Sequence, residues 1–147
     1  MEEPLAIALA TVTKKYLNQL SKRLLHLSID RYHYVLVLID NYQEALSQKA
    51  LAELLNIDKS YMVCILDYLG EQGYIIREKN PQDRREQMIK LTSKARTDLP
   101  LIKDAIEELN SLCLKNIGDK EKQTFRIITH TILSNLSDDV PNQTPSN

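Results

Sequence analysis

The segment from Ser47 to Thr92 constrains the fold most, because two short helical patterns are followed directly by a charged hairpin pattern. Apolar residues at spacings of three and four predict one helix over residues 47–55 and a second over residues 58–72. Ser47 is a residue type that caps helix starts, and either Asp58 or Ser60 can cap the second helix. The short turn between them predicts a helix-turn-helix.

A short hairpin is predicted directly after the second helix. Gly73 can adopt the left-handed conformation that ends a helix, and residues 74–77 have the composition of a strand. Residues 80–83 have turn composition, and residues 87–91 alternate polar and apolar side chains as a returning strand. Two helices and a hairpin are the layout of a winged helix-turn-helix, which places one helix in the DNA major groove and a basic hairpin against the backbone or minor groove.

The chain is predicted to be helical on both sides of this module. Apolar spacing predicts helices over residues 5–27, over 30–42 with Asp30 as its cap, and over 93–116 and 119–136. Pro100 is expected to kink the third of these helices, because proline lacks an N–H. The expected fold is mainly α with a small β-hairpin, and the long amphipathic N-terminal helix suggests a partner helix from a second copy.

Positive charge is concentrated in one part of the chain. The net charge is −1, yet residues 77–96 contain seven Lys or Arg and three acidic residues, or +4. The remainder carries 12 basic and 17 acidic residues, or −5. Because DNA binding needs a local positive face rather than a basic chain, the segment can supply one.

Other functional classes find little support in the sequence. Two cysteines do not indicate a disulfide framework, the acidic N-terminus is not a signal peptide, and no apolar run is long enough to span a membrane. A reducing cytoplasm is expected. His26, His33 and His130 lack metal-site spacing, and no nucleophile elbow or glycine-rich phosphate loop is present. We therefore expect no enzyme activity, no metal and no cofactor.

Three stretches within Ser47–Thr92, ALAELLNI, ILDYLGEQGYIIRE and NPQDRREQMIKLT, identify a family resemblance. The most specific is the third, in which Asp83-Arg84-Arg85 is followed by Ile89-Lys90-Leu91-Thr92. The chain resembles the multiple antibiotic resistance regulator (MarR) family of bacterial transcription factors over about residues 5–137.

The resemblance implies a homodimer that regulates transcription. One domain would cover residues 1–137, with dimerisation helices at 5–29 and 93–137, a winged helix-turn-helix core at 30–92 and a flexible tail at 138–147. Members usually repress transcription by binding pseudo-palindromic operators in double-stranded DNA. Many lose DNA affinity when a small, often aromatic, acid binds, and others respond to cysteine oxidation or to metals.

The resemblance also assigns the DNA-binding residues. Ser47 at the start of the first helix would cap it, meet phosphate, or do both. Arg85 would enter the minor groove, and Asp83 would orient it. Val63 and Cys64 depart from the family, which commonly has Thr or Ser followed by Arg there. The expected contacts are Ser47, Gln48, Lys49, Lys59, Ser60, Tyr61, Val63, Cys64, Asp67 or Tyr68, Lys79, Asp83, Arg84 and Arg85, with Arg77 behind the wing.

Several alternatives remain open at the sequence level. Arg31, Tyr32, His33 and Tyr34 either line an effector cavity or serve as ordinary structural residues. Cys64 is either an oxidisable thiol or, as we favour, a small residue packed under its helix, and Cys113 is expected in the core or at a dimer contact. The main alternative function is a winged-helix protein-interaction module that has lost base recognition.

Overall fold

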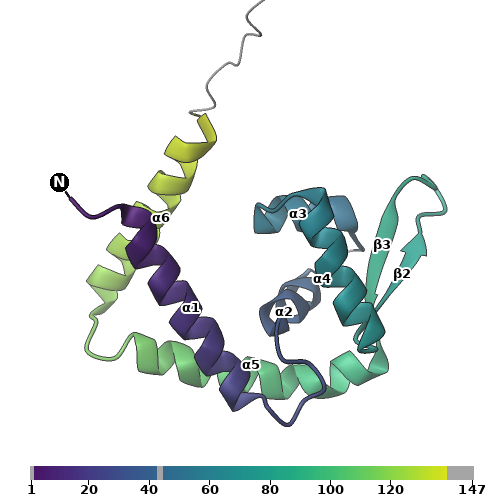
Figure 1. Cartoon of the computed structure of the whole chain (residues 1–147), viewed down its shortest axis with the longest axis horizontal. Helices are drawn as coiled ribbons and strands as arrows, with labels where there is room; N and C mark the ends of the chain where they lie inside the picture. Colours follow the sequence, from purple (N-terminus) through teal and green to yellow (C-terminus); the bar gives the residue numbers. More distant parts are fainter. Residues whose placement is uncertain (1, 43–44, 139–147) are drawn as a thin grey trace, which may run out of the picture. The chain divides into compact units, whose positions relative to one another are not determined.

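The computed structural model describes residues 2–42 and 45–138 (Figure 1). The chain divides between Leu109 and Asn110 into two compact units. The predicted tail, residues 138–147, lies outside the described residues apart from Asp138, the last residue of a helix.

The first unit holds the winged helix-turn-helix, and its element order confirms the predicted fold class. The elements are α1 (Leu5–Arg23), α2 (His33–Asn41), β1 (Leu46–Ser47), α3 (Gln48–Leu55), α4 (Lys59–Glu71), β2 (Ile75–Lys79), β3 (Gln87–Leu91) and α5 (Ser93–Cys113). Helix α5 continues through Pro100 and carries its last four residues into the second unit. The second unit also contains α6 (Asp119–Asp138).

The sheet has one strand more than the predicted hairpin. Its order is β1-β3-β2, with both pairings antiparallel, and Ile89 of β3 lies opposite both Leu46 and Arg77. Strand β1 has only two residues, which is too short to produce a recognisable alternation in the sequence. It ties the start of α3 to the hairpin, which we call the wing (residues 75–91).

The core of the first unit forms where the apolar helix stripes meet the sheet. Leu36, Leu51, Leu66 and Ile102 are completely shielded from solvent and come from four different helices. Their burial stabilises the unit by roughly 1.5–3 kcal/mol per side chain through the hydrophobic effect. The predicted apolar faces of α2, α3, α4 and α5 therefore form one common core.

Two predicted helix boundaries were wrong. Asp30 does not cap α2, because the chain first turns through Tyr32, whose φ of 64° is left-handed. The Asp30 carboxylate instead accepts a hydrogen bond from the Tyr68 hydroxyl, at 2.6 Å. Helix α1 ends at Arg23, and Leu24 lies in the turn that follows. Because Leu24 is buried although it is outside the helix, it continued the apolar spacing and the helix was predicted to be too long.

The hinge between the wing and α5 is held by several contacts. The Thr92 hydroxyl donates to the Gly73 carbonyl at 2.6 Å and accepts from the Ala95 N–H at 3.2 Å, so it caps α5. The Tyr74 hydroxyl donates to Asp98 at 2.7 Å. Burial, and then this bond, raise the pKa of Tyr74. The end of α4 and the start of α5 are thereby fixed to each other.

Candidate nucleic-acid interface

Two capped helix starts form the helix-turn-helix. The Ser47 hydroxyl accepts from the Ala50 N–H at 3.1 Å, and the Asp58 carboxylate accepts from the Tyr61 N–H at 2.7 Å. The predicted Ser47 cap is confirmed, and of the two residues predicted for the second helix, Asp58 is the one that caps it. Between the helices the chain turns through Asn56, whose φ is 52°. Each cap satisfies one of the backbone donors left over at a helix start and fixes where that helix begins.

Helix α4 presents three distinct sides. Met62, Ile65, Leu66 and Leu69 are buried and define its inner side. Because each residue rotates about 100° around a helix, Ser60, Cys64 and Asp67 lie roughly opposite, and all three are exposed. We call these three residues the outer ridge of α4. Tyr61 and Tyr68 lie along one flank of this ridge, and Lys59 and Val63 lie along the other.

The structure corrects the expected environment of both cysteines. Cys64 is exposed, so the favoured prediction that it packs under its helix was wrong. Its position on the outer ridge explains this, because the small apolar side chain suggested burial while the helix phase excludes it. Cys113, the last residue of α5, is exposed as well, so the core alternative was wrong and the dimer contact stays a prediction.

The wing fixes the backbone and Nε of Arg85 and leaves most of the Arg85 side chain exposed. The Asp83 carboxylate accepts from both the backbone N–H and the Nε–H of Arg85, each at 3.1 Å. The Arg85 side chain is nevertheless 91% exposed. These bonds from Arg85 lower the pKa of Asp83 and keep it charged. Asn80 closes the turn by donating to the Glu86 carboxylate at 2.9 Å.

One groove of about 920 Å³ joins the helix-turn-helix to the wing. Six of the predicted DNA-binding residues line it: Ser47, Gln48, Lys49, Lys59, Asp83 and Arg85. The lining contains three basic and three acidic side chains, so the groove itself carries no charge excess. The local positive excess comes from outside it, where Lys79 and Arg84 are exposed. Ser60, Tyr61 and Cys64 are also exposed beyond this lining, whereas Val63 is half-buried.

An ion pair missed by the sequence analysis connects the outer ridge to the wing. Arg77 of β2 donates through its guanidinium to the Asp67 carboxylate of α4. Both side chains are only partly covered. Since the two residues are ten positions apart on different elements, spacing alone gave no signal of this contact.

The four candidate effector residues do not converge on one point. The Arg31 guanidinium lies over the rings of Tyr32 and Tyr68, at 5.6 and 4.6 Å from their centroids. His33 is buried, and its Nε2 lies 3.1 Å from the Ile29 carbonyl. Burial lowers the pKa of His33 and raises that of the half-buried Tyr34. Arg31 and Tyr32 thus lie beside α4, while His33 belongs to the core.

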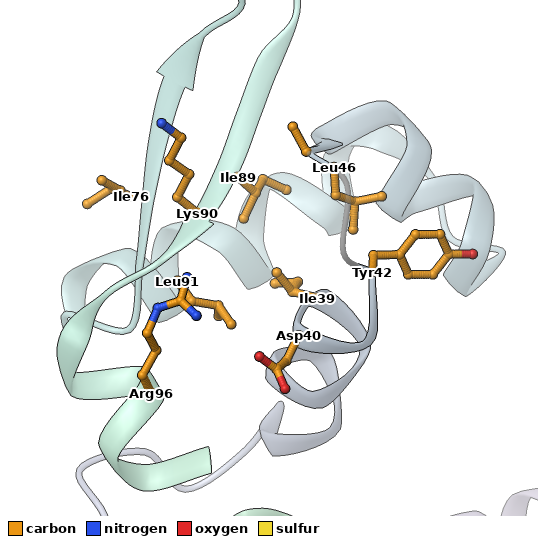
Figure 2. Close-up of a pocket in the computed structure, with 10 residues that line it drawn as sticks. Ile39, Asp40, Tyr42, Leu46, Ile76, Ile89, Lys90, Leu91 and Arg96 are labelled. Atoms are coloured by element: carbon orange, nitrogen blue, oxygen red, sulfur yellow. The ribbon is translucent and has the colours of Figure 1, made fainter.

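A cavity of about 520 Å³ lies between α2, the sheet and the start of α5 (Figure 2). Ile39, Leu46, Ile89 and Leu91 form its apolar part, and Figure 2 shows Arg96 extending from α5 toward Leu91. A second cavity of about 480 Å³ shares Asp40 and Arg96 with the first. Neither cavity was predictable from the sequence, because their walls come from segments distant in the chain.

Two of the basic side chains around these cavities, Lys103 and Lys90, form ion pairs, whereas Arg96 does not within the described residues. Lys103 donates to Asp40 at 2.6 Å, and Lys90 pairs with Glu78 at 2.7 Å. No ion pair involves Arg96 within the described parts of the chain. Arg96 therefore has a guanidinium available to an anion in the cavity.

Within residues 2–42 and 45–138, no group of three or more His, Cys, Asp or Glu side chains is placed to hold a metal ion. No helix in these ranges is long and apolar enough to cross a membrane.

Comparison with known proteins gives a family match for the DNA-binding part of the chain. The MarR family model matches residues 29–87, which include the helix-turn-helix and most of the wing. The S. aureus MepR–DNA complex has a TM-score of 0.83 at 17% identity, with 92% of this chain and 99% of that chain covered. An E. coli MarR mutant complexed with operator DNA gives 0.77 at 24%, covering 88% and 94%.

A third solved structure contains a bound small molecule. CouR from Rhodococcus jostii RHA1, bound to p-coumaroyl-CoA, has a TM-score of 0.74 at 25% identity, with 88% of this chain and 92% of that chain covered. The family-model match shows that residues 29–87 are a MarR-family segment, and the solved structures show that nearly the whole chain shares the fold of MarR-family winged helix-turn-helix proteins.

Proposed function

We propose that this protein is a homodimeric transcriptional repressor that binds a pseudo-palindromic operator in double-stranded DNA and is released by a small-molecule effector. The observation that carries the proposal is the groove shared by Ser47, Lys59 and Arg85, because the two helix starts and the wing open onto the same side. Exposed helix starts offer N–H groups to phosphate, and an exposed arginine suits a narrow minor groove.

Backbone contacts supply most of the proposed affinity. The outer ridge of α4 offers Ser60 and Cys64 to base edges, and Val63 beside it can only make apolar contacts. A thiol hydrogen-bonds weakly and valine not at all, so direct base recognition is limited. Lys49, Lys59 and Arg85 instead supply the phosphate and minor-groove contacts.

The dimer is supported by apolar surface that the single chain leaves uncovered. On α1, Leu5, Leu9 and Val12 are 55%, 45% and 67% exposed. On α6, Phe125 and Leu136 are 62% and 70% exposed. An amphipathic helix normally buries its apolar stripe against another element. We propose that residues 5–29 and 93–137 interlock with the same segments of a second copy.

The effector is proposed to be a small apolar molecule with an acidic group. The solved structure of CouR contains p-coumaroyl-CoA. In this chain, the cavity in Figure 2 combines apolar walls with the unpaired Arg96. Its wall includes β3, so a bound molecule would contact the wing directly. Residues Arg31–Tyr34 remain the second candidate site.

Fluorescence anisotropy with the DNA upstream of the protein's own gene tests the function. We expect binding at low salt and a marked loss of affinity for Arg85→Gln. If the wild-type protein fails to bind at low salt, the alternative of a protein-interaction module gains support and the repressor proposal fails.

Benzoate, a small aromatic carboxylate, tests the effector site by melting temperature. We expect stabilisation of the wild-type protein that is lost in Arg96→Gln and kept in Tyr34→Phe. The reverse pattern would move the site to Arg31–Tyr34.

A further inference from the structure

The connection from α1 to α2 is anchored to one flank of α4. The Tyr68 hydroxyl donates to the Asp30 carboxylate at 2.6 Å and accepts from the Asp30 N–H at 3.1 Å. The hydrogen bond from Tyr68 is the largest of the effects that lower the pKa of Asp30. The rings of Tyr32 and Tyr68 meet edge to face at 5.7 Å. The chain reaches this position through the left-handed backbone of Tyr32.

Arg31 is held in place by these contacts while its charge stays accessible. Its guanidinium lies 4.6 Å from the centroid of Tyr68 and 5.6 Å from that of Tyr32, both within cation–π range. The side chain is still 60% exposed. Its nearest acid, Asp30, lies 3.8 Å from Nε and is already engaged by Tyr68. A guanidinium fixed in this way loses less conformational entropy on binding a further anion than a free one does.

Arg31 and the wing contact different flanks of α4. Around the helix, Tyr68 is about 100° from Asp67, and Asp67 pairs with Arg77 of the wing. Figure 1 shows the wing on one side of α4 and α2, with the connection leading into it, on the other. A helix about 10–12 Å across fills a major groove about 12 Å wide, so a phosphate strand runs along each of its sides.

We propose that Arg31 binds a DNA phosphate along a different flank of α4 from the one that the wing contacts, so that the helix is gripped from both groove walls. This inference rests on the proposed DNA binding. It assigns Arg31 to the nucleic-acid interface rather than to the effector site, and it makes Tyr68 a positioning residue that presents Arg31. A phosphate contact of this kind adds affinity without reading sequence.

Arg31→Gln in the full-length protein tests the proposal by the salt dependence of DNA binding. Each lost phosphate contact lowers the slope of log affinity against log salt by about 0.9, or about 1.8 for two copies in a dimer. We expect this decrease, with an affinity loss of equal size on operator and on random DNA. Arg31→Lys keeps the charge and should restore the slope.

Lys14→Gln serves as the matched control, because it removes one positive charge from α1 on the side away from its apolar stripe. It should leave the slope unchanged. A purely structural role for Arg31 would lower the melting temperature or affinity while the slope of Arg31→Gln stayed at the wild-type value, and that result would overturn the proposal. This overturning result can be seen only if the wild-type protein binds DNA. It is therefore distinguishable from a failure of the proposed function, in which the wild-type protein does not bind DNA.

Discussion

The ion pair between Asp67 and Arg77 leads to a quantitative prediction about DNA affinity. Asp67 lies on the outer ridge of α4, which we propose faces DNA, and its charge is neutralised by Arg77. Both side chains are substantially exposed, so the pair contributes only about 0–1 kcal/mol to folding. Arg77→Gln should therefore leave the fold intact and expose an uncompensated carboxylate to the DNA phosphates.

The size of this effect follows from Coulomb's law. Two unit charges 4 Å apart interact by about 1 kcal/mol in water. One such repulsion per subunit weakens binding about fivefold, and two weaken a dimer roughly 25-fold. Asp67→Asn in the Arg77→Gln background removes the repulsion and should restore affinity to within about threefold of wild type.

Fluorescence anisotropy at fixed salt, with all four members of this double-mutant cycle, measures the coupling. Asp67→Asn alone should bind at least as tightly as wild type, because the freed Arg77 adds a positive charge. If Arg77→Gln and the double variant bind equally weakly, Arg77 acts by touching DNA itself and the charge-compensation argument is refuted.

Three further predictions concern folding and titration. Leu66→Ala should lower the free energy of unfolding by about 2–5 kcal/mol, whereas Cys64→Ala on the opposite side of α4 should change it by less than about 0.5, both measured by urea denaturation; equal losses would contradict the orientation of α4. Burial lowers the folded pKa of His33, so its contribution to stability is present above its unfolded pKa and is lost as the pH falls through the folded value. His33→Gln should flatten the decline in melting temperature on acidification, and an unchanged pH profile would count against this. Tyr68→Phe should raise the pKa of Asp30 toward its ordinary value in a carboxyl NMR titration, and no change would disprove the hydrogen bond.

The sequence predicted best those features that depend on local chemistry. Ser47 and Asp58 cap their helices through hydrogen bonds spanning three residues. Gly73 has the left-handed φ of 80° expected of a residue that ends a helix. Strand β3 has the predicted bounds because alternation over five residues is a clear signal.

Features that depend on contacts between distant segments were not predictable in this way. The carboxylate of Asp30 was assigned as a cap, yet its partner is Tyr68, 38 residues away. The cavity in Figure 2 is assembled from α2, the sheet and α5, and no local pattern indicates it. Cys64 was placed wrongly for a different reason. Its position around α4 indicates exposure, but its small apolar side chain was taken to indicate burial.

We propose above that the wing and both helix starts hold the backbone of operator DNA. The most direct test is salt-dependent anisotropy of wild type and Arg85→Gln on the DNA upstream of the protein's own gene. We expect wild type to bind at low salt, its affinity to fall steeply with salt, and Arg85→Gln to weaken binding and lower that slope. Absence of wild-type binding at low salt, or an Arg85→Gln variant with unchanged affinity and slope, would contradict the proposed role of the wing and the helix starts.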